Sequence, residues 1–236
     1  MKHVAQETGR WWCPRPINFV KDYRRTWSTT RQFLNRYRWF SLSFVILVLF
    51  SAALFLHPHD RTLLLQIQES HDPGLDRIAA EVSHWGDFLF FNIGGAMFIW
   101  LFGYVRGLRW VQRLAYSALF GAICAGVVCN AFRLTMGRAR PKAMVADRFY
   151  GFQGTLQGWN YHGFPSGHTS TAFGAGVPLA TAAGVWGAPI LVVSGTVGWS
   201  RLYKNQHYPT DVFVGAALGL LFGTATSWHL RKVRLR

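Results

Sequence analysis

Acidic residues are scarce in this chain: 10 Asp and Glu stand against 25 Lys and Arg, which gives a formal net charge of +15 at pH 7. Charged residues make up only 15% of the 236 residues, whereas half of the residues are hydrophobic. A nucleic-acid-binding protein would gather its Lys and Arg in basic patches. Here most basic residues lie outside the apolar runs instead. We therefore expect no nucleic-acid partner, but a membrane protein whose cationic segments face anionic lipid headgroups.

Cysteine is also scarce, which argues against a disulfide framework. Cys13 lies in a basic tail, and Cys124 and Cys129 lie within one apolar run, where packing explains them without a metal or redox role. The chain also lacks the short charged start of a cleavable signal peptide, since roughly forty residues rich in Arg and Trp precede the first apolar run.

Long apolar runs are abundant, and a membrane-spanning helix needs about 20 mostly apolar residues. The candidate spans are Trp39–Leu56, Phe88–Val105, Leu114–Phe132, two within Thr169–Trp199, and Asp211 to about Leu230. The fourth and fifth share a run that is broken near Trp186, Gly187 and Pro189. Two full spans would need about 60 Å of helix, which is more than this run of residues provides. One long helix is therefore the alternative there. The expected fold is all-α, an integral-membrane bundle of six transmembrane helices.

The segment between the first two spans, His57 to Asp87, is polar with apolar residues at helical spacing. We expect an interfacial amphipathic helix on the outer membrane surface. A lid over a substrate groove is the alternative.

The positive-inside rule sets the orientation. Residues 1–38, 106–113 and 231–236 carry nine, three and four Lys or Arg, and six of the other nine crowd around the motifs described next. We therefore assign residues 1–38 and 231–236 as basic cytoplasmic tails and residues 39–230 as the membrane domain. Both termini then lie in the cytoplasm.

Three polar stretches lie at the outer ends of the predicted spans. They are Arg133–Lys142 (RLTMGRARPK), Phe164–Ser170 (FPSGHTS) and Ser200–Asp211 (SRLYKNQHYPTD). Guanidinium groups suit bidentate contact with phosphate oxygens, and amides at the start of an apolar helix favour an anion. Histidine exchanges protons near neutral pH, and a carboxylate four residues later can fix its tautomer if a helix begins at Pro209. The combination predicts a phosphate site, although each stretch alone could be a turn or a set of interface charges.

These stretches resemble the type 2 phosphatidic acid phosphatase (PAP2) superfamily, whose signature is K-x6-R-P, then P-S-G-H, then S-R-x5-H-x3-D. Residues 133–141 match the first motif with Arg in place of Lys, residues 165–168 match the second, and residues 200–211 match the third. The resemblance covers roughly residues 85–230. It implies metal-independent hydrolysis of a phosphate monoester or diphosphate on a membrane lipid, through a phosphohistidine. The residues that it implies are His207 as nucleophile, Asp211 to orient it, His168 as proton donor, and Arg133, Arg140, Ser166, Gly167 and Arg201 around the phosphate.

The resemblance further implies a bacterial-type inner membrane, with the active site on the periplasmic or extracellular face. Candidate substrates are undecaprenyl diphosphate, phosphatidylglycerol phosphate, phosphatidate and lipid A, and we expect no cofactor. A phosphotransferase that passes the phosphate to an acceptor lipid would share every motif. A vanadate-dependent haloperoxidase, a channel or transporter, and a metal site built on the same histidines are further alternatives.

Overall fold

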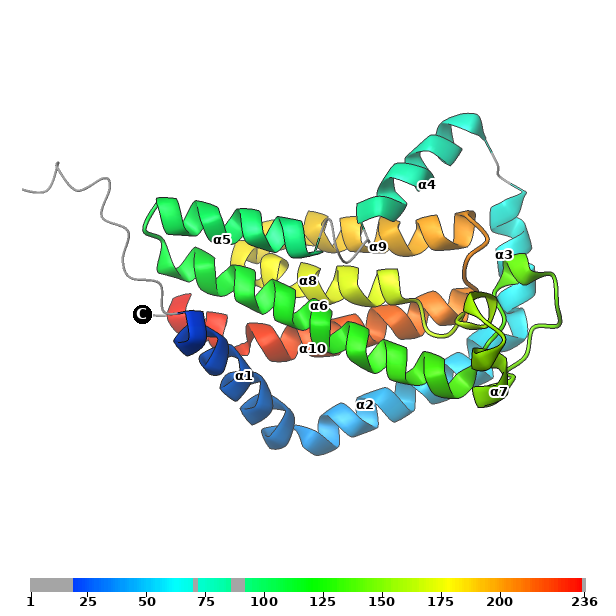
Figure 1. Ribbon diagram of the computed structural model, residues 1–236, viewed down its shortest axis with the longest axis horizontal. Helices are drawn as coiled ribbons and strands as arrows, with labels where there is room; N and C mark the ends of the chain where they lie inside the picture. Colours follow the sequence, from blue (N-terminus) through cyan, green and yellow to red (C-terminus); the bar gives the residue numbers. More distant parts are fainter. Residues whose placement is uncertain (1–18, 70–71, 86–91, 235–236) are drawn as a thin grey trace, which may run out of the picture.

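The computed structural model describes residues 19–69, 72–85 and 92–234, and this part of the chain is helical without a strand. Its helices are α1 (Phe19–Arg36), α2 (Arg38–Ser51), α3 (Asp60–Gln68), α4 (Pro73–Trp85), α5 (Gly95–Val105), α6 (Arg109–Met136), α7 (Gly151–Leu156), α8 (Gly167–Ala183), α9 (Ala188–Tyr203) and α10 (Pro209–Arg234). A π-helical turn (Ala52–Leu56) and a 3-10 turn (His57–His59) join α2 to α3. The all-α prediction is confirmed for this part of the chain (Figure 1).

Four helical stretches of the described residues are long and apolar enough to cross a membrane. They are Arg38–Gln68, Arg109–Met136, Gly167–Tyr203 and Pro209–Trp228, with Asn92–Val105 as a shorter apolar helix. The chain is therefore a membrane protein, as its composition indicated. The count of six spans stays a prediction, and residues 88–91 of the second predicted span lie outside the described residues.

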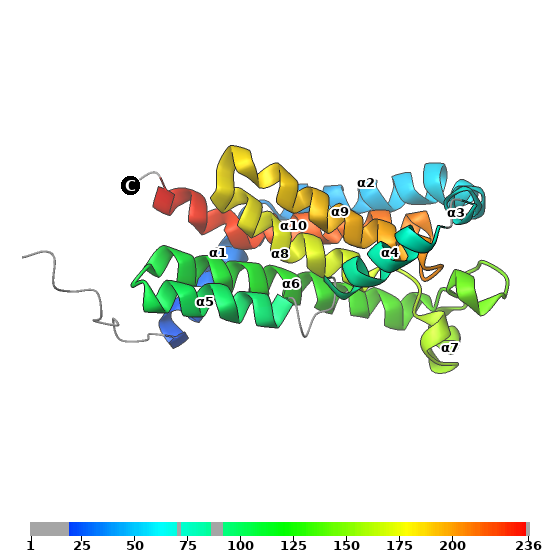
Figure 2. The same ribbon diagram turned by 90° about the horizontal axis from the view of Figure 1, so that it is seen from above.

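The stretch Gly167–Tyr203 is an antiparallel pair of short helices (Figure 2). A 3-10 turn, Gly184–Gly187, separates α8 from α9, and Gly184 adopts a positive φ of 67°. The Ser194 hydroxyl on α9 donates to the Ala172 carbonyl on α8 at 3.1 Å. The predicted break near Trp186 is therefore present. The start of α8 and the end of α9 both lie toward the end of the bundle where α3 and α7 lie (Figure 1).

Helices α6, α8 and α10 form the centre of the bundle, and glycines allow their close approach. A Cβ atom at Gly219 would lie 2.5 Å from both the Phe173 Cβ and the Ser170 carbonyl oxygen of α8. A Cβ atom at Gly215 would lie 2.5 Å from the Ser166 carbonyl oxygen. Small residues let helix backbones approach in this way. The start of α10 is thereby held against the start of α8.

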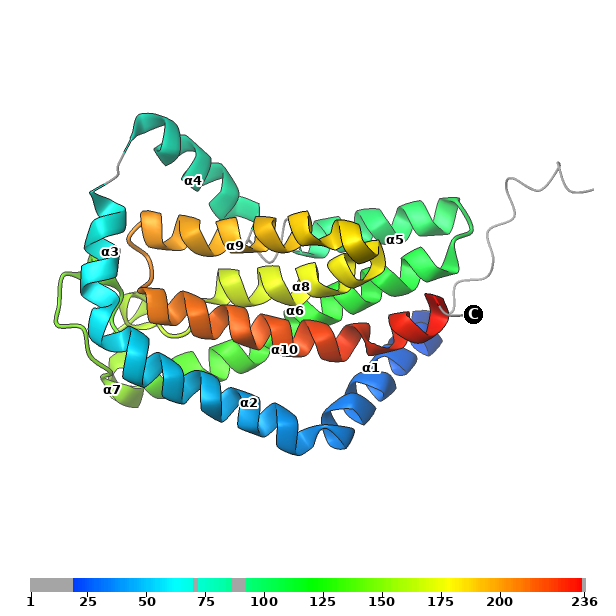
Figure 3. The same cartoon turned by 180° about the vertical axis from the view of Figure 1, so that it is seen from behind.

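The segment predicted as one interfacial helix consists of two helices instead. The start of α4 at Pro73 is consistent with proline's preference for the first helical turn, and residues 70, 71, 86 and 87 lie outside the described residues. Helix α3 lies across the ends of α9 and α10 (Figure 3). The Gln68 side chain donates to the carbonyl oxygens of Leu202 and Tyr203 at 2.8 and 3.0 Å, which fastens α3 to the end of α9. Whether these helices lie in a membrane interface stays a prediction.

Part of the predicted N-terminal tail is helix α1, and residues 1–18 lie outside the described residues. Phe33 packs against Trp228 near the end of α10, with ring centroids 5.3 Å apart. The α5–α6 turn, α1 and the last turns of α10 lie together at one end of the bundle (Figure 1). The described parts of the basic segments predicted to be cytoplasmic therefore share one end, opposite the end where α3 and α7 lie.

Candidate active site

The three predicted motif stretches meet at the bundle end where α3 and α7 lie (Figure 1). Backbone hydrogen bonds tie them together. The Ser166 amide donates to the Asp211 carbonyl at 2.9 Å, and the Lys142 amide donates to the Asn205 carbonyl at 3.2 Å. The turn after α6, the start of α8 and the α9–α10 connection are thus held in one cluster, although they are far apart in the sequence.

His207 lies at the centre of this cluster and is fully buried. Its Nδ1 atom lies 2.7 Å from the Gly163 carbonyl oxygen and 3.5 Å from Asp211 Oδ2. Its Nε2 atom is buried and has no hydrogen-bond partner among the residues that the structure describes. Because a carbonyl oxygen can only accept, Nδ1 carries the hydrogen and Nε2 keeps its lone pair. Burial lowers the pKa of His207 well below 6.5, and the positive charges of Arg140, Arg201 and Arg133 lower it further.

Asp211 is also fully buried, in the first turn of α10. The predicted helix start at Pro209 is confirmed. Asp211 Oδ1 accepts a hydrogen bond from Arg138 at 2.7 Å, and Oδ2 accepts one from the Tyr208 amide at 2.8 Å. For the His207 Nδ1 atom, the Gly163 carbonyl oxygen at 2.7 Å is a closer acceptor than Asp211 Oδ2 at 3.5 Å.

Three predicted phosphate-binding arginines converge on this region without a carboxylate partner among the described residues. Arg133 lies in the last turn of α6, Arg140 in the turn after it, and Arg201 near the end of α9. All three are at most 8% exposed, and within the described part of the chain the Nε atoms of Arg140 and Arg201 have no hydrogen-bond partner. Burial and the neighbouring charges of Arg133 and Arg201 lower the pKa of Arg140 to about 10. Buried cations without a counter-charge are costly, and a bound anion would lower that cost.

Neutral contacts hold these guanidinium groups in place. Arg133 Nε donates to the Pro165 carbonyl at 3.1 Å, and Arg140 Nη1 donates to the Gln206 side-chain oxygen at 2.9 Å. Arg201 Nη1 donates to the Ser83 hydroxyl on α4. Trp159 lies over the guanidinium groups of both Arg140 and Arg133, at 4.6 and 5.9 Å from the ring centroid. These contacts orient the cations without neutralising them.

The predicted anion-binding helix start is Ser166–Gly167–His168 at the beginning of α8. Ser166 is the N-cap residue, its amide donates to the Asp211 carbonyl, and its hydroxyl accepts a hydrogen bond from the Thr169 hydroxyl at 2.9 Å, so its contact with a phosphate stays a prediction. Gly167 packs directly on Arg133, because a Cβ atom there would lie 2.6 Å from Arg133 Nη2. His168 is half-buried in the first turn of α8. Glycine at position 167 therefore lets an arginine of the cluster approach the helix start.

Sequence reasoning missed a second charged cluster beside the site. Arg138 is fully buried and contacts the carboxylates of Asp60, Asp147 and Asp211, and its Nη2 atom also lies 3.2 Å from His57 Nδ1. Ligand atoms of His57, Asp60 and Asp147 lie within 4.8 Å of one another, a spacing that suits a metal ion. The Arg138 guanidinium already supplies a cation to these groups. Only its place in the basic RARPK run could have singled out Arg138.

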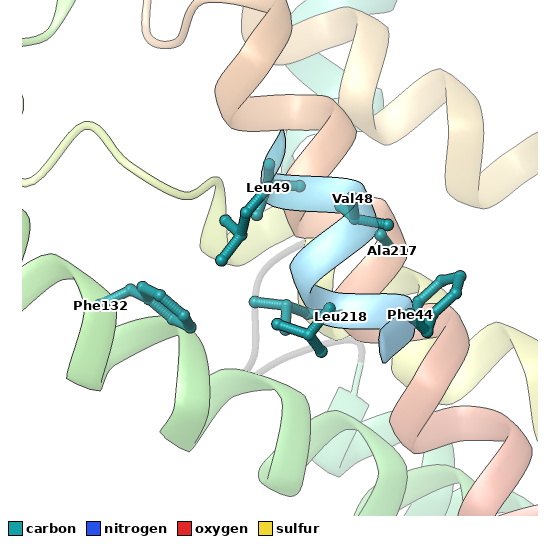
Figure 4. A pocket seen from close by; sticks show the side chains of 8 residues that line it. Phe44, Val48, Leu49, Phe132, Ala217 and Leu218 are labelled. Carbon is teal, nitrogen blue, oxygen red and sulfur yellow. The ribbon is translucent and has the colours of Figure 1, made fainter. Parts of the chain in front are cut away.

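A small apolar pocket with a free volume of about 10 Å³ lies between α2, α6 and α10 (Figure 4). It is lined by Phe44, Val45, Val48, Leu49, Phe132, Val214, Ala217 and Leu218. Phe132 directly precedes Arg133, and Val214 lies one helical turn after Asp211. The pocket is thus lined by apolar residues that neighbour Arg133 and Asp211 in the sequence.

Fold and site together define a class of protein: a helical membrane protein with a cluster of buried arginines beside a buried histidine. The chain belongs to the PAP2 superfamily, whose family model matches residues 114–234, just over half of the chain. The matched region contains all three motif stretches. The family resemblance seen in the sequence is thereby confirmed.

Curated relatives and solved structures agree with this family. The chain is 33% identical over 138 residues to a lipid A 1-phosphatase of Porphyromonas gingivalis, covering 54% of this chain and 26% of the relative. It is 28% identical over 178 residues to a lipid A 4'-phosphatase of Bacteroides thetaiotaomicron, covering 70% and 74%. It is 26% identical over 125 residues to an undecaprenyl-diphosphatase of Bacillus subtilis, covering 53% and 60%. The chain spans about a quarter of the Porphyromonas relative and 48% of a Rhizobium johnstonii lipid A 1-phosphatase.

Two solved structures share the fold at 20% sequence identity. The phosphatidylglycerolphosphate phosphatase of Bacillus subtilis superposes with a TM-score of 0.60 over 83% of this chain and 98% of that chain. Aquifex aeolicus LpxE superposes with a TM-score of 0.55 over 71% and 93%. The helical arrangement is therefore that of known membrane phosphatases of this superfamily.

Proposed function

We propose that this protein hydrolyses a phosphate monoester or diphosphate on a membrane lipid through a phosphohistidine at His207. The observation that carries the proposal is the pairing of an unpartnered, buried His207 Nε2 with three arginines that lack a carboxylate. A buried nucleophile and an uncompensated positive cluster are both costly unless an anionic group binds between them. A phosphate supplies both the electrophile and the negative charge.

The reaction has two steps in this scheme. In the first, the Nε2 lone pair attacks phosphorus in line while the bond to the leaving oxygen breaks, and His168 gives a proton to that oxygen. In the second, His168 accepts a proton from water, the water oxygen attacks phosphorus, and the P–N bond breaks to return the electron pair to Nε2. Arg133, Arg140 and Arg201 hold the equatorial oxygens and stabilise their charge in both transition states. No step requires a metal, since the guanidinium groups supply the positive charge.

The lipid part of the substrate is supported by the apolar surroundings. Phe132 and Val214 line the small apolar pocket, so apolar side chains stand close in the sequence to Arg133 and Asp211, where the hydrocarbon part of a lipid would meet them (Figure 4). Lipid A heads the candidate substrates because relatives from three genera are lipid A phosphatases. Undecaprenyl diphosphate comes second because another relative is an undecaprenyl-diphosphatase. Phosphatidylglycerol phosphate and phosphatidate complete the set.

The membrane setting is part of the proposal. We place the protein in a bacterial inner membrane, with both termini in the cytoplasm and the active site at the periplasmic face. The support is the positive-inside rule together with the gathering of α1, the α5–α6 turn and the end of α10 at the bundle end away from the site (Figure 1).

Phosphate release by the purified protein across a panel of lipid phosphates and diphosphates tests the activity. We expect turnover of at least one substrate, with none in the His207→Ala variant. Asp22→Asn is the control, because Asp22 pairs with Arg109 and Arg113 on the opposite end of the bundle, and it should retain wild-type turnover. Equal turnover in His207→Ala, or no phosphate release from any lipid by the wild type, would overturn the proposal.

A further inference from the structure

We propose that Arg138 is a positioning residue for this reaction, holding Asp211 and through it His207, and that Asp60 anchors Arg138 in turn. The inference rests on the proposed function, since it concerns the same histidine. Arg138 occupies one of the six unspecified positions of the first signature motif, two residues before Arg140. Its role is therefore to be derived from its contacts.

Arg138 differs in its partners from Arg133, Arg140 and Arg201, the three arginines that we call the arginine cage. Its Nη1 donates to Asp211 Oδ1 at 2.7 Å, its Nη2 to Asp60 Oδ2 at 2.7 Å, and its Nε to Asp147 Oδ1 at 2.9 Å. Burial alone would lower the pKa of Arg138, but Asp211, Asp147 and Asp60 raise it above its ordinary value. Each of the three guanidinium nitrogen atoms thus donates to a carboxylate. Arg138 positions groups of the protein, whereas Arg133, Arg140 and Arg201 remain available to a phosphate.

Two aromatic rings fix the plane of the Arg138 guanidinium. Its central carbon lies 4.4 Å from the Tyr208 ring centroid and 5.3 Å from that of Phe149. Tyr208 is the neighbour of His207 in the chain, and its amide donates to Asp211 Oδ2 at 2.8 Å. A planar guanidinium group that packs against aromatic rings fixes the direction of each N–H bond, which an ammonium group cannot do. The position of Asp211 is therefore determined from both of its oxygens.

Asp60 connects this arrangement to the end of the first span. It is fully buried at the start of α3, and its Oδ1 accepts a hydrogen bond from the Thr210 amide at 2.8 Å. Thr210 lies in the first turn of α10, where amides lack an intrahelical partner and a negative charge is favourable. Asp60 thus caps the helix that carries Asp211 and holds Arg138 at the same time.

The charges of the two clusters suit the two sides of the reacting histidine. Arg138 with Asp60, Asp147 and Asp211 carries one positive and three negative charges, and it lies toward Nδ1. The imidazole ring becomes positive when Nε2 binds phosphorus, so a net negative cluster on the Nδ1 side stabilises that state. The three cage arginines stabilise the phosphoryl oxygens. Arg138 keeps the carboxylates together without placing a fourth free cation at the phosphate.

Steady-state kinetics of Arg138→Lys and Asp60→Asn in the full-length protein test the positioning role. We expect kcat to fall by about 10- to 100-fold in Arg138→Lys, since small misplacements of reacting groups have effects of this size. KM should change by less than about threefold, because the phosphate contacts remain. Asp60→Asn keeps its size and its acceptor for Thr210, so it should fold and lose kcat to a smaller extent. Asp22→Asn is again the control at the other end of the bundle.

A double-mutant cycle with Asp211→Asn separates positioning from a general loss of stability. If Arg138 acts through Asp211, adding Arg138→Lys to Asp211→Asn should reduce kcat little further, because the two losses are not independent. Multiplicative losses, or wild-type kcat in both Arg138→Lys and Asp60→Asn, would overturn the inference. Failure of the proposed function gives a different result, namely no phosphate release by the wild type itself.

Discussion

The imidazole of His207 donates from Nδ1 to the carbonyl oxygen of Gly163 at 2.7 Å. A backbone carbonyl has no proton to give, so this contact fixes the tautomer and leaves the lone pair on Nε2. Asp211 Oδ2 lies farther away, at 3.5 Å. The backbone thus shares with Asp211 the task that the sequence had assigned to Asp211 alone.

Asp211→Asn should therefore be impaired but not inactive. The Gly163 carbonyl still holds the reactive tautomer, while the negative charge behind the ring is lost. We expect kcat to fall by about 100-fold, as for a misplaced reacting group, with the loss measured as phosphate release at saturating substrate. A loss as complete as that of His207→Ala would show that Gly163 cannot hold the tautomer by itself.

The pH dependence of kcat/KM should reflect the lowered pKa of His207. Burial, followed by the charges of Arg140, Arg201 and Arg133, lowers this pKa well below 6.5. The ring is neutral at every pH above its pKa, so its nucleophilicity is lost only as the pH falls through that lowered value. In Arg140→Gln one cause of the shift is removed, and the acid limb should move toward 6.5. A wild-type acid limb at 6.5, or a shift to lower pH in the variant, would contradict this.

Orthovanadate, an analogue of phosphate, should stabilise the protein by filling the arginine cage. A ligand at 100 times its Kd adds about 2.7 kcal/mol to the free energy of unfolding, which corresponds to roughly 5 to 10 °C in unfolding temperature for a chain of this size. Arg201→Gln should lose most of this increase. Arg148→Gln is the control, since Arg148 is exposed and lies over Tyr150 outside the cage. An equal increase in both variants would place the anion elsewhere.

Gly167→Ala should disturb the site without unfolding the chain. The added Cβ would lie 2.6 Å from the flexible end of Arg133, so the guanidinium must move away from the start of α8. We expect kcat/KM to fall by roughly tenfold or more, as for other displaced site groups. Gly195→Ala on α9 is the matched control, because nothing lies within 4 Å of its added Cβ. Wild-type kcat/KM in Gly167→Ala would mean that Arg133 can occupy its place from another direction.

The sequence predicted the parts of the structure that depend on local pattern. The break near Trp186 and the start of α10 at Pro209 are present, because glycine and proline impose their backbone preferences whatever the surroundings. The meeting of the three motif stretches was inferred from their chemistry and from the predicted side of the membrane.

The pairing of charges was not predictable from the sequence. Arg138 stands in a basic run with Arg140, and nothing local distinguishes the arginine that binds three carboxylates from the one that binds none. Asp60 lies 78 residues away, in the segment that was predicted to form an interfacial helix. Such pairs depend on how the ends of helices that are distant in the sequence meet, so they can be identified only from the three-dimensional structure.

Rapid-quench trapping of the enzyme after mixing with a 32P-labelled lipid phosphate is the sharpest test of His207 as nucleophile. We predict a labelled protein that is stable in base and labile in acid, with the label on His207, forming at least as fast as kcat and absent in His207→Ala. Turnover without a labelled protein at any time, or a label on another residue, would contradict a phosphohistidine at His207.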